Sequence, residues 1–356
     1  MTRVEKIREK FEEKGIDALI VLDELNQHYL SGFAFTDGLL LITKTRALLI
    51  TDFRYYEMAQ NEAYGEFEVI IPDNRVEVIT KALKAEGCKK LGFEGGSICF
   101  ATYNKYRETY SFCELVNIGT VIEELREIKD AEEIELIQKA QNITDAAFSE
   151  VVKHIRADMT EIDVAAELEY FMRKAGASGL AFDTIAVSGD ASALPHGTPR
   201  NVKLRPGFLT MDFGAKYRGY CSDMTRTVVI GRATSEIRKV YNTVLNAQLA
   251  ALDVIKAGAD CAECDKAARE LIDSADEFRG TFGHSLGHGV GLYIHESPRL
   301  ARVASGRVLR EGEIVTVEPG IYLFGKYGCR IEDMVAVKKG GIYNFTHSTK
   351  ELIEIL

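Results

Sequence analysis

Three of the chain's seven histidines lie close together in the segment GHSLGHGVGLYIHESP, residues 283–298. Imidazoles serve in proteins as metal ligands and as carriers of protons. A histidine by itself, however, is more often an ordinary polar side chain. Metal chemistry at this segment therefore requires acidic residues from elsewhere in the chain.

Two acidic pairs in separate predicted hairpins meet this requirement. In GFLTMDFGAKYRGYCSDMTRTVVIG, a turn centred in KYRG places Asp212 directly opposite Asp223. In EIVTVEPGIYLFGKYGCRIEDMVAV, a loop centred on Gly325 places Glu318 opposite Glu332. Like charges that face each other on a sheet destabilise it, and a bound cation removes that cost. We therefore predict that these four carboxylates hold metal ions.

Four carboxylates and one imidazole form an oxygen-rich set of ligands. Such a set suits Mn, Co, Fe or Zn, and it can bridge two ions that lie about 3.5–4 Å apart. Two metal ions generate a hydroxide nucleophile near neutral pH and polarise the carbonyl under attack. The segments LRPGFLTMDFG and LREGEIVTVEPG share an L-R-x-G opening and a T-x-acid-x-G ending. This echo predicts two similar halves that face one central site.

The elements that position these residues fall into two regions. In residues 1–122, short apolar runs such as IDALIVL and GLLLIT alternate with helical segments, which predicts a small α/β domain. In residues 123–356, long helical segments separate strand-rich ones, which predicts an α+β domain whose helices cover a largely antiparallel sheet. One of these helices carries a predicted capping box, with Thr160 as the N-cap and Asp163 three residues later, and Gly176 ends it.

The composition argues against several classes of protein. A net charge of −10 disfavours general nucleic-acid binding. No apolar run reaches the 18 or so residues that span a bilayer, and MTRVEKIREKFEEKG lacks the apolar core of a signal peptide, so we expect a cytoplasmic protein. The cysteines are odd in number and scattered. Cys261 and Cys264 form a C-x-x-C motif without a second pair at zinc-site spacing, and we expect them to pack in a core.

Several separated motifs also resemble those of one family. MDFGA with SDMTRT, GHGVG with HESP, VEPGIY and RIEDM together resemble the pita-bread metallopeptidases, in the branch of Xaa-Pro aminopeptidases and prolidases. NQHYLSGF and the small α/β domain resemble the creatinase-type N-terminal domain of the same branch. The resemblance implies an α+β fold, with a pita-bread catalytic domain at 123–356 and a smaller creatinase-type α/β domain at 1–122.

The resemblance also implies a metal centre. The implied ligands of two divalent metal ions per chain (Mn, Co or Zn) are Asp212, Asp223, His288, Glu318 and Glu332. Glu318 would also shuttle a proton from the bridging water. Thr225 and Arg330 stand beside ligands and would orient them.

The remaining implied residues would contact a substrate. His196 and His295 would bind the scissile carbonyl and stabilise the tetrahedral intermediate and the leaving nitrogen, and His284 would line the site. Arg299, in HESPR, stands where prolidases place an arginine that holds the carboxylate of a dipeptide. The implied substrates are proline-containing short peptides, and the implied assembly is a homodimer.

The implied reaction is hydrolysis of Xaa-Pro bonds in dipeptides or short peptides by attack of a metal-bridging hydroxide. Proline specificity rests on the resemblance alone. Dipeptidase and aminopeptidase action stay open, with Arg299 favouring the dipeptidase. A creatinase-like hydrolase and a metal-free peptide-binding module are alternatives that the full set of five ligands disfavours. A methionine aminopeptidase is disfavoured by the N-terminal domain.

Overall fold

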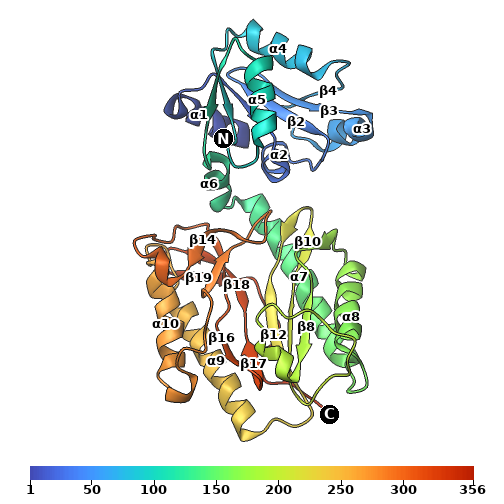
Figure 1. Cartoon of the computed structure of the whole chain (residues 1–356), viewed down its shortest axis with the longest axis vertical. Helices are drawn as coiled ribbons and strands as arrows, with labels where there is room; N and C mark the ends of the chain where they lie inside the picture. The colour runs from blue at the N-terminus through green and yellow to red at the C-terminus, as the bar shows by residue number, and fades with distance from the viewer. The chain divides into compact units, whose positions relative to one another are not determined.

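The computed structural model describes residues 1–356, which form two units, Met1–Arg126 and Glu127–Leu356 (Figure 1). The short helix α6 (Val121–Glu127) spans the division between them. A domain boundary between residues 122 and 123 stays a prediction, and it would fall inside this helix. None of the helices combines the length and the apolar character that a membrane crossing needs.

The N-terminal unit is built on one mixed sheet with the strand order β4-β3-β2-β1-β5-β6. Alternate residues of its central strands, such as Ile20 and Leu41, share a buried cluster with Ile79 and Leu83 of α4. The strands are β1 (Ala18–Val21), β2 (Gly38–Thr43), β3 (Ala47–Thr51), β4 (Glu68–Ile70), β5 (Lys90–Phe93) and β6 (Glu114–Asn117). The other helices are α1 (Arg3–Lys14), α2 (Glu24–Ser31), α3 (Phe53–Glu62), α4 (Arg75–Ala85) and α5 (Phe100–Thr109). The alternation of strands and helices confirms the predicted α/β domain.

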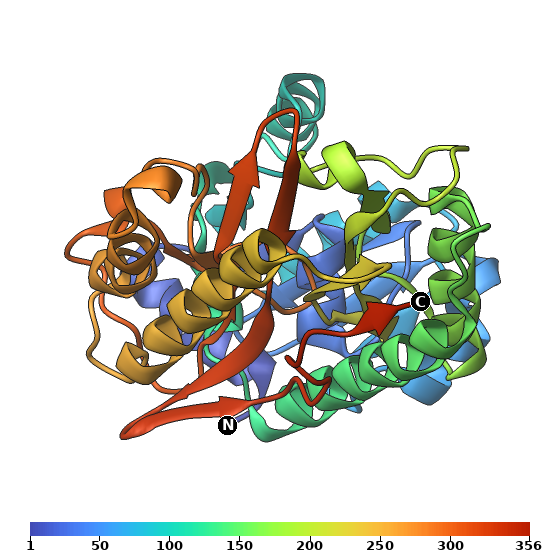
Figure 2. The same ribbon diagram turned by 90° about the horizontal axis from the view of Figure 1, so that it is seen from below.

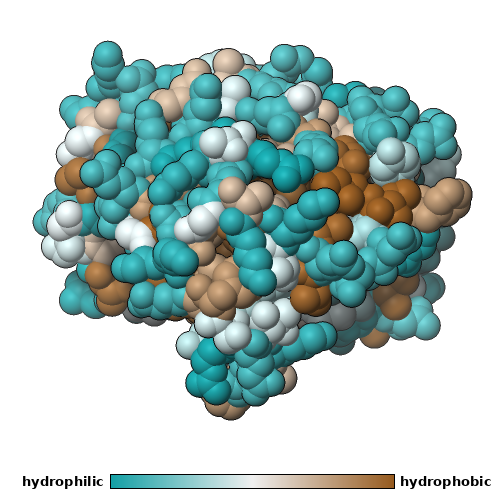
Figure 3. Space-filling view, turned by 90° about the horizontal axis from the view of Figure 1, so that it is seen from above, coloured by the Kyte–Doolittle hydropathy of each residue, from teal (hydrophilic) through white to brown (hydrophobic).

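The surface in the view of Figure 3 is mostly hydrophilic, with apolar residues gathered in a few places. Among the apolar side chains of the N-terminal unit, Phe53 and Phe100 are the most exposed, at 84% and 78%. Single exposed apolar residues are common on protein surfaces and need no special explanation.

The C-terminal unit consists of two halves that repeat one plan, a sheet covered by a pair of long helices (Figures 1 and 2). In the first half, the sheet β20-β12-β9-β8 packs on α7 and α8. In the second half, the sheet β14-β13-β15-β18-β19 packs on α9 and α10. This repeat is the arrangement that the echo between the two acidic segments predicts.

The bounds of these elements follow from the structure. The first half comprises α7 (Ala131–His154), α8 (Glu161–Lys174), β8 (Ile185–Ser188), β9 (Gly207–Phe213), β12 (Met224–Ile230) and β20 (Glu354–Ile355). The second half comprises α9 (Ser235–Val254), α10 (Cys261–Asp273), β13 (Gly287–Gly289), β14 (Glu296–Leu300), β15 (Ile314–Val317), β18 (Asp333–Lys338) and β19 (Gly341–Asn344). Short elements complete the unit: β7 (Gly179–Leu180), β10 (Ala215–Tyr217), β11 (Tyr220–Cys221), β16 (Gly320–Leu323), β17 (Tyr327–Arg330) and the 3₁₀ turns η1 (Gly189–Ala193), η2 (Asp276–Phe278) and η3 (Arg302–Ala304). β20 pairs parallel with β12 at the edge of the first sheet.

Local signals in the sequence set several of these elements. Thr160 and Asp163 form the predicted capping box at the start of α8, and Gly176, with φ 104°, follows its end. Cys261 and Cys264 lie on α10 inside the core of the second half, where burial raises their thiol pKa values to about 11 and about 12. These thiols are packed as expected, and they are protonated at neutral pH.

The first hairpin differs from its prediction in register. Asp212 on β9 lies opposite Thr225 on β12, so the prediction that it lies directly opposite Asp223 is wrong. The two-residue turn falls at Arg218 and Gly219, both with positive φ (47° and 85°), later than the expected centre. The displacement is two positions along the partner strand. Because side chains alternate with a period of two, both carboxylates stay on one face.

The second hairpin has the predicted register. β15 pairs with β18, and β16 pairs with β17, around a loop that contains Gly325, whose φ is 75°. The last pair of the β15–β18 ladder is Val317 with Asp333. Glu318 and Glu332 are the next residues on the two strands, and they therefore face each other as predicted.

Candidate metal centre and active site

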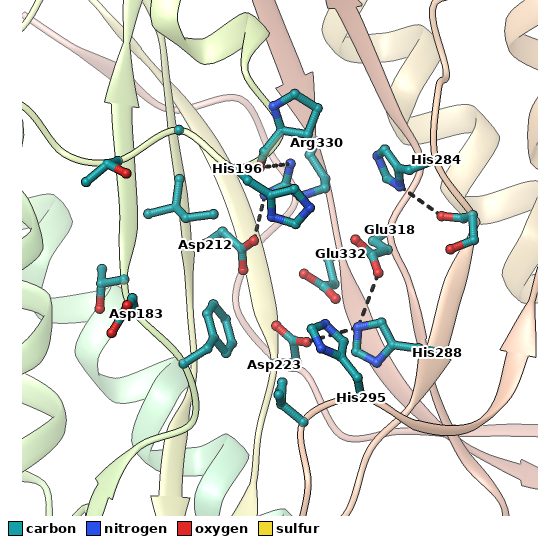
Figure 4. Close-up of a pocket in the computed structure, with 18 of the residues that line it drawn as sticks. Asp183, His196, Asp212, Asp223, His284, His288, His295, Glu318, Arg330 and Glu332 are labelled. Atoms are coloured by element: carbon teal, nitrogen blue, oxygen red, sulfur yellow. Dashed lines mark hydrogen bonds and ion pairs between the residues drawn. The ribbon is translucent and has the colours of Figure 1, made fainter.

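A cavity of about 830 Å³ in the C-terminal unit collects the predicted site residues (Figure 4). Except for Thr225, all of them line it: His196, Asp212, Asp223, His284, His288, His295, Arg299, Glu318, Arg330 and Glu332. The first half contributes Asp212 from β9 and Asp223 from the residues just before β12. The second half contributes the other three predicted metal ligands, which lie on or beside β13, β15 and β18.

Three of the five predicted ligands form a compact donor group. Ligand atoms of Asp223, His288 and Glu332 all lie within 4.8 Å of one another. The Nε2 atom of His288 lies 3.5 Å from Oδ2 of Asp223 and 3.4 Å from Oε1 of Glu318. Asp212 lines the same cavity, although its oxygens are not part of that compact group.

The imidazole of His288 presents a lone pair to these acids. Its Nδ1 lies 3.0 Å from the carbonyl oxygen of Gly289, which only accepts hydrogen bonds, so Nδ1 carries the proton. Burial lowers the pKa of His288 to about 4, which keeps the ring neutral. Nε2 therefore has a lone pair and no proton where it faces the carboxyl oxygens of Asp223 and Glu318. A cation bound between these atoms would stabilise the arrangement.

The acids themselves have too few compensating donors. Burial, followed by repulsion from neighbouring carboxylates, raises the pKa of Asp223 and of Glu332 well above the usual range. Burial likewise raises the pKa of Glu318 to about 8. Oδ1 of Asp212 and Oε1 of Glu332 are buried without a hydrogen-bond partner. Unpaired oxygens beside an imidazole lone pair fit divalent cations that prefer oxygen and nitrogen ligands.

Arg330 and Thr225 hold two of these acids in place. Nη2 of Arg330 donates to Oδ2 of Asp212 at 2.6 Å, and Nε donates to the hydroxyl of Thr225 at 3.0 Å. The Thr225 hydroxyl in turn donates to Oε2 of Glu332 at 2.8 Å. Thr225 thus lies outside the cavity wall but contacts a lining carboxylate, and one guanidinium is linked to acids from both halves.

A buried tyrosine, which the sequence analysis did not identify, fixes His284. Nδ1 of His284 lies 2.9 Å from the carbonyl oxygen of Ser285 and therefore carries the proton. Nε2 accepts from the Tyr322 hydroxyl at 2.9 Å, and that hydroxyl accepts from Nη1 of Arg330 at 2.8 Å. Burial lowers the pKa of His284 to about 4, so the ring is neutral. Tyr322 belongs to the VEPGIY motif, which was the available signal.

The remaining histidines and Arg299 are exposed to the cavity. His196 and His295 lie on opposite sides of the carboxylates and point toward them (Figure 4). The His295 ring is 4.4 Å from that of His288, and burial, then the charge of His196, lowers the pKa of His295. The backbone of Arg299 is part of β14, and its guanidinium makes no hydrogen bond or ion pair within the chain.

Part of the cavity wall is apolar. Phe182, Ile185 and Ile294 line it together with Pro195. Ile185 lies directly opposite Asp212 in the β8–β9 ladder, which brings an apolar side chain next to an acidic one. The sequence analysis named none of these residues, because nothing local separates an apolar lining residue from a core residue. The site thus joins a charged centre to an apolar wall, as a pocket for a small organic ligand does.

Comparisons with known proteins agree with this geometry. Residues 135–339 match the model of metallopeptidase family M24, and residues 3–128 match the creatinase/prolidase N-terminal domain. The chain belongs to metallopeptidase family M24. This membership confirms the predicted family, the pita-bread catalytic domain and the creatinase-type N-terminal domain. It also implies divalent metal ions, which the donor group described above fits.

Relatives of this family M24 chain match it along nearly its whole length. It is 38% identical to the Xaa-Pro dipeptidase of Pyrococcus horikoshii over 99% of this chain and 98% of that protein. The structure of an Xaa-Pro dipeptidase from Bacillus anthracis superposes with a TM-score of 0.93 at 42% identity, covering 99% of each chain. The structure of an X-Pro aminopeptidase from Thermotoga maritima gives 0.92 at 37% identity, covering 98% of this chain and 100% of that chain.

Proposed function

We propose that this chain is a metal-dependent exopeptidase that hydrolyses Xaa-Pro bonds in dipeptides or short peptides. The observation that carries the proposal is the buried group of carboxylates and one imidazole in the cavity, in which Oδ1 of Asp212 and Oε1 of Glu332 have no hydrogen-bond partner. Similarity to proteins named Xaa-Pro dipeptidase and X-Pro aminopeptidase supports the class of substrate.

We infer that two divalent metal ions bind per chain. Their ligands would be Asp212, Asp223, His288, Glu318 and Glu332. When bound, such ions supply Lewis-acid polarisation of a carbonyl and a lowered pKa for water. Mn as the metal and a homodimeric assembly stay predictions from the family resemblance, and a cytoplasmic location stays a prediction from the pattern of apolar residues in the sequence.

The chain's own residues would manage the protons and the developing charge. Glu318, which lines the cavity beside His288, would take a proton from the attacking water on a carboxylate oxygen. It would then pass that proton to the proline nitrogen, which must be protonated to leave as an amine. His196 and His295 would contact the oxygen of the scissile carbonyl and the leaving nitrogen from the two sides of the carboxylates.

Residues of the cavity wall would also select substrates by their length. The free guanidinium of Arg299 would hold the terminal carboxylate of an Xaa-Pro dipeptide. His284, fixed by Tyr322, would line the site beside it. The apolar wall of Phe182, Ile185 and Ile294 offers surface for a proline ring. Dipeptidase action is therefore favoured, with Xaa-Pro aminopeptidase action as the alternative.

The test is product analysis by mass spectrometry after incubation of metal-depleted protein and Mn(II) with Ala-Pro, Ala-Pro-Ala and Ala-Ala-Ala. We expect cleavage of Ala-Pro. Cleavage of Ala-Pro-Ala at its first bond would favour the aminopeptidase. Cleavage of Ala-Ala-Ala would refute the proline restriction, and no cleavage with Mn, Co or Zn would favour a peptide-binding module.

Matched variants exclude a contaminating peptidase from this test. Glu318→Gln keeps the shape of the side chain but removes the proton carrier, and we expect its activity to fall to background. Glu311→Gln changes an exposed glutamate by the same chemistry and should leave activity unchanged. Equal activity in the two variants would remove Glu318 from the mechanism.

A further inference from the structure

The loop of residues 189–200, here the His196 loop, forms one wall of the cavity. It follows directly after Ser188, the last residue of β8, and its only regular parts are η1 and a turn in which the Gly197 amide donates to the Leu194 carbonyl oxygen. Five consecutive residues line the cavity: Pro195, His196, Gly197, Thr198 and Pro199. Within the loop, Nη1 of Arg330 donates to the Pro195 carbonyl oxygen at 3.3 Å, and the Ser192 hydroxyl accepts from the Gly328 amide at 2.9 Å. The position of the His196 ring depends on these bonds together with those that hold the two ends of the loop.

One buried carboxylate, that of Glu161 on α8, holds both ends. Oε1 of Glu161 accepts from the backbone amide and the hydroxyl of Ser188, at 2.8 and 2.9 Å. Oε2 accepts from the backbone amide and Nε of Arg200, at 3.0 and 2.8 Å. Nη2 of Arg200 adds a bond to Oε1 at 2.7 Å. All of these contacts go to the residue before the loop and to its last residue.

The helix does not need this carboxylate. Thr160 and Asp163 already cap α8 through their reciprocal hydrogen bonds, and Glu161 makes none of them. Its side chain is fully buried, which is costly for a carboxylate unless donors compensate it. Burial by itself raises the pKa of Glu161, but the bonds from Arg200 and Ser188 outweigh it and hold the pKa below the usual value. The charge is thus kept in the interior by contacts with the loop.

We propose that Glu161 is a positioning residue for His196, because it fixes both ends of the His196 loop and thereby the place of the imidazole in the cavity. The inference rests on the substrate contact proposed above for His196. Release of one end would leave the segment around His196 held mainly by the bonds at Pro195 and Ser192, which lie to one side of the imidazole in the sequence. A displacement of about 1 Å at a reacting group costs up to about a hundredfold in rate.

The first test replaces Glu161 with glutamine. An amide has one acceptor oxygen, so Glu161→Gln can serve the Ser188 end or the Arg200 end but not both. We expect kcat/KM for Ala-Pro with Mn(II) to fall by about tenfold or more, with metal content unchanged. Asp163→Asn is the matched control, because it weakens the cap of the same helix without touching the loop, and its activity should stay within about twofold.

A double-mutant cycle with His196→Ala separates positioning from a general loss of structure. If Glu161 acts through His196, Glu161→Gln should lower kcat/KM by less than about twofold once the imidazole is absent. A merely structural role would give the same fold loss with and without His196. Equal losses in the two backgrounds would overturn the proposal.

Hydrogen–deuterium exchange of the full-length protein tests the anchor without activity. Amides of residues 189–200 should exchange faster in Glu161→Gln and at the normal rate in Asp163→Asn. If the wild type cleaves no Xaa-Pro peptide, the proposed function fails, and this measurement still shows whether Glu161 holds the loop. If Glu161→Gln does not fold, Arg200→Lys keeps a cation for Glu161 but loses the Nε–Nη2 fork, and it should speed exchange in the same segment. Unchanged exchange there would overturn the proposal.

Discussion

Two adjacent buried acids have opposite surroundings where the chain leaves the cavity and enters β18: Glu332 precedes the strand and Asp333 is its first residue. Oδ1 of Asp333 accepts from Nη2 of Arg226 at 2.8 Å. Its Oδ2 accepts from Nζ of Lys350 at 2.7 Å and from Nδ2 of Asn344 at 2.9 Å. Burial by itself raises the pKa of Asp333, but the two cations outweigh it and lower that pKa. This carboxylate is saturated with donors.

Glu332 has no such partners. One of its oxygens accepts only from the neutral hydroxyl of Thr225, and the other accepts from nothing in the chain. The nearest charges are mostly acids, Asp223 first among them, and its pKa is raised by burial and by their repulsion. Burial therefore does not by itself mark a metal ligand. A buried acid is a candidate metal ligand when its surroundings supply too few hydrogen-bond donors.

Glu332→Gln should have the largest effect on activity. Loss of one ligand should lower kcat/KM by at least about a thousandfold, well beyond the 10- to 100-fold typical of residues that only orient a ligand. The metal-free variant should be no less stable than the metal-free wild type, because a neutral amide avoids the cost of a buried carboxyl that must either hold a proton or repel its neighbours. Activity assays and urea unfolding in EDTA measure the two quantities. Near-normal activity would rule out Glu332 as a ligand.

Asp333→Asn should mainly lower the stability of the fold, whereas Glu332→Gln should mainly lower activity. The buried Arg226 and the half-buried Lys350 would be left without their shared anion, and the free energy of unfolding should fall by about 3–5 kcal/mol. The loss should be the same with and without metal, because Asp333 contacts the cations of the chain and not the cavity. Urea unfolding tests this, and a loss seen only in the metal-loaded protein would contradict the contrast between the two acids.

The stability of the metal-free protein should depend on pH in opposite ways through the two kinds of acid. The folded-state pKa of Glu318, about 8, lies above its unfolded value of 4.5, so its contribution to stability is present at low pH and is lost as the pH rises through about 8. The lowered pKa of Asp333 contributes stability above the usual value, 3.8, and loses it only in acid.

We therefore expect the free energy of unfolding in EDTA to fall by roughly 2–3 kcal/mol between about pH 6 and pH 8.5, since one pKa unit is worth about 1.4 kcal/mol. Mn(II) should abolish this slope, because the cation replaces the protons that the acids otherwise hold. Unfolding by urea across this range measures both curves. A metal-free protein that gains stability with rising pH would show that the raised pKa values are wrong.

Arg299→Ala should have the smallest effect. This cation has no acid partner in the chain, so its removal leaves no buried charge unpaired. If it holds a substrate carboxylate, KM for Ala-Pro should rise by about tenfold, whereas KM for Ala-Pro-Ala should change by less than about twofold. Steady-state kinetics on the two peptides decide the matter. Equal changes would assign Arg299 no part in choosing the length of the substrate.

Much of this fold was open to prediction because its signals are local. The capping box of Thr160 and Asp163 needs only four consecutive residues, and the second hairpin needs only its loop. The first hairpin was displaced because Arg218, a residue that rarely adopts positive φ, occupies the first position of its turn. The prediction that Asp212 and Asp223 share one face of the hairpin still held, because the displacement was by an even number of positions.

The parts of the site that escaped prediction depend on distant partners. Arg226 and Asp333 are 107 positions apart. Arg330 was identified through its motif, but its bond to Asp212, 118 positions away, was not. Nothing near a buried arginine in the sequence distinguishes it from an arginine on the surface. Tyr322 and Glu161 were missed for the same reason, since their function lies in side chains that only the tertiary fold brings to them.

The position of β20 has a consequence for how the chain is made. This strand, residues 354–355, completes the edge of the first sheet by pairing with β12, yet the ribosome adds it after the entire second half. The nascent first half therefore emerges with one edge of its sheet uncovered, and unpaired edges are where chains associate wrongly. The first half to be translated is the last to be finished.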